Sequence, residues 1–148
     1  MFYLFPQLAD KPKLLKLEQL WQAEKNSLTY KAGYTLMAFK AANYVPQTAS
    51  LAKSTLDWLM ESQRDDGGFG PWKNHPAASD VFCTSISTLG MVQYKESVPA
   101  RFFQKSFRWL MGNRLANGIW PFHEIEDGAS WGLYTLTMLT RYGLSGNV

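Results

Sequence analysis

Apolar residues recur along the chain at the spacing of α-helices, and the alternation typical of β-strands is absent. After Pro99, which a first helical turn tolerates, Phe103, Phe107 and Leu110 form one apolar stripe. The pattern therefore predicts an all-α fold of about six helices. The expected helices cover about residues 13–26, 29–44, 50–63, 79–94, a segment that follows Pro99, and 128–142.

The helical pattern repeats along the chain with a period of about 50 residues. Residues 56–60 (LDWLM) correspond to residues 107–111 (FRWLM). Residues 85–89 (SISTL) correspond to residues 135–139 (TLTML), and residues 35–39 (TLMAF) precede them by the same interval. The sequence thus predicts one domain over residues 1–148, built from three helical hairpins. Their predicted bounds are about 13–44, 50–94 and 98–142.

The two helices of each predicted hairpin differ in polarity. The second helices, around residues 34–39, 83–92 and 131–139, are almost uncharged, and a helix that is apolar on all sides is expected to be buried on all sides. The first helices carry charged residues such as Asp57 and Arg108. We therefore expect an inner layer of second helices and an outer layer of first helices.

Composition limits the classes of function. Hydrophobic residues make up 46% of the 148 residues and charged residues 18%, which is typical of a folded globular chain. A net charge of +3 without a basic stripe argues against a nucleic-acid partner. A single cysteine, Cys83, excludes an internal disulfide and a four-cysteine zinc site.

No targeting sequence or membrane-spanning stretch is visible, so we expect a soluble, cytoplasmic protein. The aromatic segment Met1–Pro6 has two interpretations. It packs as an arm on its own domain or on a neighbouring subunit, or, with Lys11, Lys13 and Lys16 behind it, it makes peripheral contact with a membrane surface.

The loop after the predicted helix 50–63 carries the most specific motif. Gln63 ends the helix, and Asp66-Gly67-Gly68-Phe69-Gly70 follows. This motif resembles the Gln-Trp repeat of squalene–hopene cyclases and related terpenoid cyclases, and also the repeat loops of protein prenyltransferase β subunits. A weaker copy has Arg114 in place of the glutamine and residues 117–121 (NGIWP) in place of the glycine-rich loop. The resemblance covers about residues 50–142.

The loop itself has a structural interpretation. Its three glycines allow positive φ in a tight reversal, and Phe69 and Trp72 are expected to cover the end of the hairpin. Gln63 is expected to bind exposed backbone groups at the helix end. The motif would thus join neighbouring hairpins and do no chemistry.

The resemblance implies an α/α toroid, in which inner helices surround an apolar cavity inside a ring of outer helices. A chain of three hairpins would form only half of such a ring and would expose apolar flanks. We therefore expect a homodimer or a partner chain to complete the ring; the alternative is a compact fold that deviates from the toroid.

The resemblance leaves the activity open. Class II terpenoid cyclases carry an Asp-x-Asp-Asp-Thr signature, in which the middle Asp protonates an alkene, and the corresponding residues 80–84 read DVFCT. Phe82 stands in place of the proton donor, which argues against protonation-initiated cyclisation. Asp80 is expected to be a helix N-cap. If the chain is a terpene cyclase, the acid would come from Asp80, Asp127, His123 or a partner chain.

A prenyltransferase-like zinc site is not expected, because Asp80 and Cys83 do not have the required Asp-x-Cys spacing. His75 and His123 both fall in predicted loops. Cys83 is interpreted as a buried small apolar residue. We expect neither a metal nor a cofactor.

The predicted inner helices supply the best candidates for ligand binding. At the repeat spacing, Tyr34, Thr84 and Tyr134 correspond, as do Met37, Ser87 and Thr137. These positions would line an aromatic, hydroxyl-bearing pocket, or they would be ordinary core between helices. The predicted substrate-binding residues are Tyr34, Phe82, Trp131 and Tyr134.

Two functions follow from these candidates. The first is a cyclase-like or prenyltransferase-like module that binds an apolar, isoprenoid ligand in a cavity completed on assembly. The second is a non-catalytic helical-repeat subunit that binds a protein or peptide.

Overall fold

The structure, a computed structural model, describes residues 6–8, 10–24, 27–48 and 50–146. In these residues the chain forms six α-helices and no strand, which confirms the all-α prediction. The predicted N-terminal arm lies almost wholly outside the described residues. The helices are α1 (Lys11–Glu24), α2 (Thr29–Ala41), α3 (Leu51–Ser62), α4 (Val81–Val92), α5 (Ala100–Gly112) and α6 (Ile125–Arg141), with short 3-10 turns at Pro6–Leu8 and Lys95–Ser97.

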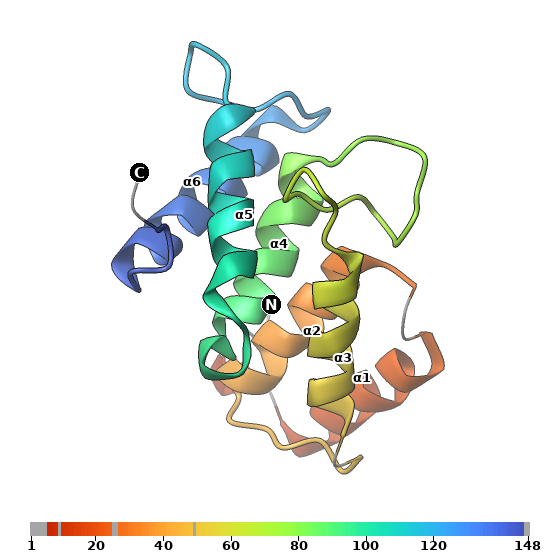
Figure 1. Ribbon diagram of the computed structural model, residues 1–148. Helices are drawn as coiled ribbons and strands as arrows, with labels where there is room; N and C mark the ends of the chain where they lie inside the picture. The colour runs from red at the N-terminus through yellow and green to blue at the C-terminus, as the bar shows by residue number, and fades with distance from the viewer. Residues whose placement is uncertain (1–5, 9, 25–26, 49, 147–148) are drawn as a thin grey trace.

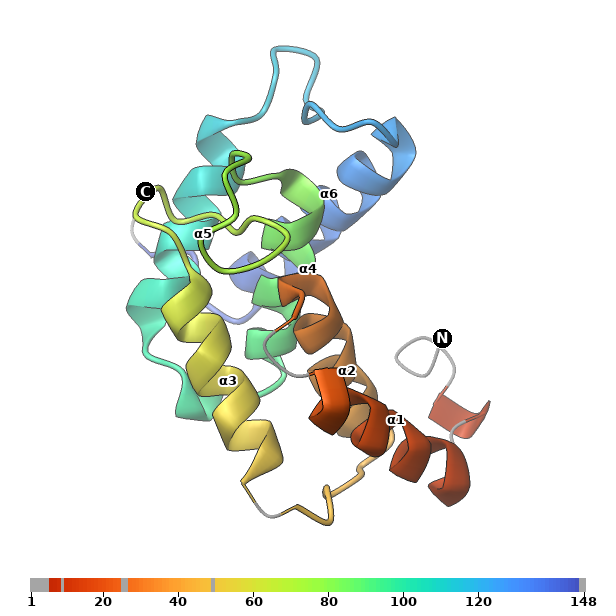
Figure 2. The same cartoon turned by 90° about the vertical axis from the view of Figure 1, so that its right-hand side faces the viewer.

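Helix α4 lies at the centre of the molecule (Figure 1). It packs against α2 and α6 over its length, and against α3 and α5 as well. Helix α1 contacts α2 at one end of the arrangement, and Figure 2 shows α6 at the other. All residues of α4 are buried except the half-buried Phe82, as expected for a helix that is apolar on all sides.

Two glycines allow α2 and α4 to cross with their backbones in contact. A Cβ atom on Gly90 would lie 2.6 Å from the Cα atom of Gly33, and one on Gly33 would lie 2.3 Å from the carbonyl oxygen of Ile86. No side chain fits at either position, so both residues at this crossing must be glycine. The periodicity of apolar residues carries no signal for such a contact.

Helix boundaries agree with the predictions at several ends and differ at α6. Asp80 is the N-cap of α4, as predicted, and its Oδ1 accepts a hydrogen bond from the backbone N–H of Cys83 at 2.7 Å. Helix α6 begins at Ile125, three residues before the predicted start at Gly128. Glu126 and Asp127 therefore lie in its first turn, where negative charge interacts favourably with the helix dipole.

The loop after α3 attaches to α5, which is the kind of contact that the structural interpretation of the motif predicts. The Nε2 group of Gln63 donates hydrogen bonds to the carbonyl oxygens of Gly67 at 3.1 Å and Phe102 at 2.9 Å. The indole N–H of Trp109 donates to Asp66 at 3.2 Å. These contacts fix the end of α3 to the middle of α5.

Two expectations for this loop were wrong in detail. Of the three glycines in this loop, only Gly67 has positive φ, at 91°. Gly68 is needed for close approach instead, because a Cβ atom would lie 2.6 Å from the Ser79 Cβ atom and 2.8 Å from the Trp109 ring. A Cβ atom on Gly70 would meet only the end of the flexible Arg64 side chain. Phe69 is fully buried as expected, but Trp72 is 45% exposed, and its ring lies 3.9 Å from that of His75 in the same loop.

A buried carboxylate fixes the turn after α2. Glu18 on α1 is 2% exposed, and its oxygens accept hydrogen bonds from the Tyr44 hydroxyl at 2.7 Å and from the backbone N–H groups of Gln47 and Thr48 at 2.9 and 2.8 Å. Burial opposes ionisation, but these hydrogen bonds outweigh it and hold the pKa of Glu18 below its ordinary value. These hydrogen bonds attach the turn after α2 to helix α1.

Candidate functional site

The four predicted substrate-binding residues lie together at the junction of α2, α4 and α6. The ring centroid of Tyr34 is 6.3 Å from that of Phe82 and 5.9 Å from that of Trp131. Trp131 in turn lies 6.3 Å from Tyr134. Their tilted and edge-to-face geometries are those that aromatic pairs prefer.

Two further rings extend this group. Tyr30, at the start of α2, lies 5.5 Å from Phe82, and Phe122, in the loop before α6, stacks on Phe82 at 5.7 Å with an interplanar angle of 14°. The spacing of four residues between Tyr30 and Tyr34 could have identified Tyr30. Phe122 follows no helical period and had no signal in the sequence. We call the complete set the aromatic face: Tyr30, Tyr34, Phe82, Phe122, Trp131 and Tyr134.

The aromatic face is only partly buried. Tyr34 is 36% exposed and Tyr134 is 38% exposed, while Phe82 and Trp131 are half-buried. Trp131 rests on a separate buried cluster that is made of Met37, Leu89 and Met138. This cluster therefore holds Trp131 in place, while Tyr34 and Tyr134 keep surface that is open to solvent.

The hydroxyl-bearing positions of α4 do not contribute to this surface, which fits the alternative that they are ordinary core between helices. Thr84 and Ser87 are both fully buried. The Thr84 hydroxyl accepts a hydrogen bond from the backbone N–H of Phe69 at 2.9 Å. Because α2 and α6 pack on both sides of α4, these positions become core, and only Phe82 reaches the aromatic face.

Two of the three candidate acids lie at the rim of the aromatic face. The His123 ring is 4.3 Å from the Phe122 ring. Burial raises the pKa of Tyr34, and the negative charge of Asp127 raises it further, which places that carboxylate near the phenol. The third candidate, Asp80, is engaged as the N-cap of α4.

The predicted burial of Cys83 is confirmed, since the side chain is 3% exposed. Burial raises the pKa of its thiol, and so does the neighbouring charge of Asp80. The reactive thiolate is therefore disfavoured at neutral pH. Among the described residues, no group of three or more His, Cys, Asp or Glu side chains is placed to hold a metal ion.

The chain is similar in sequence to one curated protein over part of its length. Over 101 residues the chain is 25% identical to protostadienol synthase A of Arthroderma gypseum. The chain is distantly similar to a triterpene cyclase. The aligned part is 62% of this chain and 14% of the synthase, so the chain spans about one seventh of that relative's length.

Neither protein-family models nor solved structures add to this similarity. No family model matches the chain, and no solved structure matches it. In the described part of the chain, no helix is both long and apolar enough to cross a membrane.

Proposed function

We propose that the chain binds an apolar, isoprenoid ligand across the aromatic face. The observation that supports this proposal most strongly is the continuous set of ring contacts from Tyr30 to Tyr134, which joins three helices and a loop. Distant similarity to a triterpene cyclase supports the isoprenoid class of ligand. Branched alkene chains pack well on tilted rings, because the apolar contact needs no fixed hydrogen-bond geometry.

The distribution of polar groups suggests how such a ligand would lie. His123 and Asp127 lie at one end of the aromatic face, where α6 begins. An isoprenoid with one hydroxyl group would place that group at this end and its hydrocarbon chain along the rings. A ligand without a polar group would lose only this orientation.

The proposed site is half of a larger one. In the proposed arrangement α2, α4 and α6 are the inner helices and α1, α3 and α5 the outer helices of an α/α half-toroid. A second copy of the chain, or a partner chain, would cover the aromatic face and complete the cavity. The partial exposure of Tyr34 and Tyr134 supports this part of the proposal, because a closed cavity would bury them.

The proposed activity is binding. Phe82, where the resemblance places the proton donor of a cyclase, is part of the aromatic face, and the carboxylate of Asp80 caps α4. Any proton donor for a reaction at this site would be Asp127, His123 or a group on the covering chain. Asp127 and His123 are candidates because both lie at the rim of the aromatic face.

A second candidate function is the binding of a protein or peptide. The observation that favours it is exposed aliphatic surface on α6, where Leu133 is 50% exposed and Ile125 is 53% exposed. A helix laid along α6 beside Leu133 would also cover Tyr134, the next residue of the helix. The two functions differ in what copurifies with the chain, an isoprenoid or a polypeptide.

Titration calorimetry with farnesol tests the proposed function. Wild-type protein should bind farnesol, and it should bind dodecanol, a straight-chain alcohol, more weakly. Tyr34→Ala should weaken farnesol binding about three- to tenfold, the effect expected from one ring contact. The matched control is Tyr142→Ala, because Tyr142 is 43% exposed but lies after the C-terminal end of α6, outside the aromatic face.

Three results would contradict the proposal. The first is no farnesol binding, and the second is equal weakening by Tyr34→Ala and Tyr142→Ala. The third is equal affinity for farnesol and dodecanol, which would indicate unspecific partition. Mass spectrometry of an organic extract of the purified protein supplies the direct comparison with the second candidate function.

A further inference from the structure

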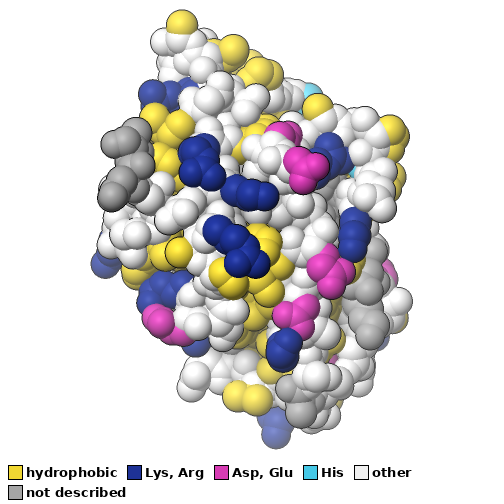
Figure 3. Space-filling view, in the orientation of Figure 1, with side chains coloured by type: hydrophobic (Ala, Val, Ile, Leu, Met, Phe, Trp, Pro, Cys, Tyr) yellow, Lys and Arg dark blue, Asp and Glu magenta, His cyan; other side chains and the backbone are white. Residues whose placement is uncertain are grey.

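The exposed side of α5 carries three cations in one row. Arg101, Lys105 and Arg108 are four and three residues apart, so they follow one face of the helix. Arg101 and Arg108 are exposed, and Lys105 is half-buried. The space-filling view shows Lys and Arg side chains grouped over this side of the molecule (Figure 3). We call these three residues the basic stripe; the expectation that the sequence holds no such stripe was wrong for α5.

The basic stripe has no ion-pair partner among the described residues. The nearby acids on α3 are paired elsewhere, since Asp57 binds Lys53 and Glu61 binds Lys73. Three positive charges on one face of α5 therefore form no ion pair among the described residues, although the Asp66 carboxylate lies beside this helix at Trp109. Each would gain from an external anion, more so if the contact excludes water.

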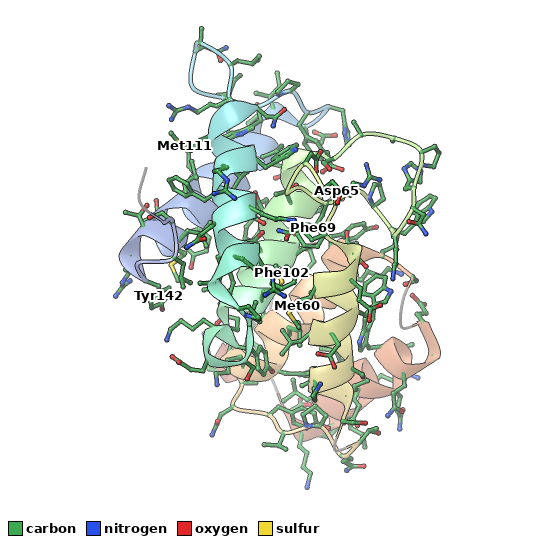
Figure 4. The ribbon with its side chains drawn as sticks, in the orientation of Figure 1. Met60, Asp65, Phe69, Phe102, Met111 and Tyr142 are labelled. Carbon is green, nitrogen blue, oxygen red and sulfur yellow. The ribbon has the colours of Figure 1, made fainter. Side chains whose placement is uncertain are left out.

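Apolar side chains lie between and beside these cations. The Arg101 guanidinium lies 4.9 Å from the centre of the Phe102 ring. Figure 4 shows Phe102 on α5 beside Met60 on α3, and both are half-buried. At the end of the same helix Met111 is 41% exposed. A surface that mixes exposed cations with apolar groups has the composition of a protein interface.

The complementary surface is found on the same chain. Glu124, Glu126 and Asp127 are all exposed at the start of α6, and none forms an ion pair within the described residues. Ile125, between them, is 53% exposed. We call the three acids the acidic turn. The acidic turn thus contains three negative charges and an exposed aliphatic side chain. The basic stripe likewise has three positive charges, with Phe102 and Met60 beside them.

One copy of the chain cannot bring the two surfaces together. In Figure 2, α5 lies on one side of the molecule and the start of α6 on the other. We propose that the basic stripe of one copy binds the acidic turn of a second copy. Each copy would then use two different surfaces, which makes the association head-to-tail and lets it close into a ring or grow as a chain.

The proposed contact has a consequence for the aromatic face. The acidic turn follows Phe122 and His123 directly, and the Asp127 carboxylate acts on Tyr34. A second copy bound there would stand at the rim of the aromatic face. This inference rests on charge and exposure alone, so it stands or falls independently of ligand binding.

Sedimentation velocity on the full chain tests the proposal by exchanging charges. At an ionic strength of about 0.01 M the mean mass should rise with protein concentration above the 16.8 kDa of one chain, and at about 1 M it should fall toward that value, because the Debye length shrinks from about 30 Å to about 3 Å. The triple variant Arg101→Glu, Lys105→Glu, Arg108→Glu should stay monomeric. So should Glu124→Lys, Glu126→Lys, Asp127→Lys.

A mixture of the two triple variants is the decisive experiment. The mixture places opposite charges across both kinds of contact again, so it should form complexes that neither variant forms alone. The matched control is Lys11→Glu, Lys16→Glu, Arg141→Glu, which makes the same change of charge at exposed positions elsewhere. It should associate like the wild type, and circular dichroism should show that all variants are folded.

Several results would overturn the proposal. One is a wild-type protein that is monomeric at every concentration in low salt, and another is association that neither triple variant changes. A mixture that stays monomeric would do the same. If the α5 variant lost binding to phosphatidylserine vesicles while the wild type showed no self-association, the partner of the basic stripe would be an anionic lipid surface instead.

Discussion

Helices α4 and α6 carry corresponding positions of the repeat, but they have different surroundings. In α4 every residue except Phe82 is buried. In α6, Leu133 is 50% exposed and Thr137 is exposed, although the corresponding residues Cys83 and Ser87 are buried. Helix α4 has α2 on one side and α6 on the other, whereas α6 packs on α4 and α5.

This difference shows that burial depends on the place of a helix in the array as well as on its composition. Both helices are almost free of charge along their middle turns, so composition predicts the same burial for both. The prediction that α6 is buried on all sides was therefore wrong. At the opposite end of the array the exposed flank is smaller, because α1 covers α2 and Glu18 fixes the adjoining turn.

The substitution with the largest expected effect separates α4 from α2, and the burial of α4 depends on that contact. Gly90→Ala would put a Cβ atom 2.6 Å from Gly33 Cα and 2.9 Å from the Gly33 carbonyl oxygen, so the two helices must separate. We expect the free energy of unfolding to fall by about 3 kcal/mol or more. The corresponding residue of α6 is Thr140, which is exposed.

Thr140→Ala is the matched control for that change. Its free energy of unfolding should stay within about 0.5 kcal/mol of the wild type, on the stabilising side, because Ala favours helix more than Thr does. Urea unfolding followed by circular dichroism measures both variants. Equal effects of the two substitutions would show that α4 and α6 are not packed as differently as described.

Thiol labelling compares the same two helices with a smaller expected effect. Cys83 on α4 should react with a maleimide very slowly in the folded protein, because burial and the Asp80 charge raise the pKa of its thiol. Leu133→Cys in a Cys83→Ala background places a thiol at the corresponding exposed position of α6. It should react at least about a hundredfold faster, since no opening of the fold is needed.

The control for labelling is the unfolded state. In urea the two thiols should react at similar rates, because both are then exposed. Fast labelling of Cys83 in the folded wild type would contradict the central position of α4. Slow labelling of Leu133→Cys at low protein concentration would show that this side of α6 is covered within one chain.

The smallest expected effect concerns the rim of the aromatic face, where α6 meets α2. The negative charge of Asp127 disfavours the Tyr34 phenolate, so Asp127→Asn should lower the pKa of Tyr34 toward its ordinary value of 10.0. A remainder of the shift should persist, because burial is its larger cause. The Tyr34 ring resonances, followed by NMR over a pH titration, report this pKa.

Glu126→Gln provides the control for the titration, since Glu126 is a neighbouring exposed acid in the same turn of α6. It should change the pKa of Tyr34 less than Asp127→Asn does. Equal shifts from both variants would indicate a general effect of net charge. No shift from Asp127→Asn would place that carboxylate away from the aromatic face.

Local features of the fold were predictable from the sequence because their causes lie within a few residues. The N-cap role of Asp80 follows from residue type and position, and the bonds of Gln63 follow from its place at a helix end. The ring contacts among Tyr34, Trp131 and Tyr134 connect residues selected by the repeat. Tyr34 and Tyr134 are corresponding positions of the sequence repeat of about 50 residues.

Contacts between distant segments were not predictable in the same way. The crossing at Gly33 and Gly90 depends on how closely two backbones approach, which no pattern of apolar residues records. Phe122 joins the aromatic face from a loop, and Glu18 is a buried carboxylate that the sequence presents as an ordinary helix residue. Burial of α4 and exposure of α6 depend on the number of neighbours, which the repeat alone does not define.

The proposed binding of an isoprenoid to the aromatic face can be tested directly, because the chain has six tryptophans. A 1H–15N spectrum resolves their indole N–H groups, and farnesol is added in steps. We predict that the Trp131 resonance shifts, while the exposed Trp72 and the buried Trp21, Trp58, Trp109 and Trp120 stay nearly unchanged. A bound ligand that leaves Trp131 unmoved, or that shifts Trp72 instead, would contradict the account.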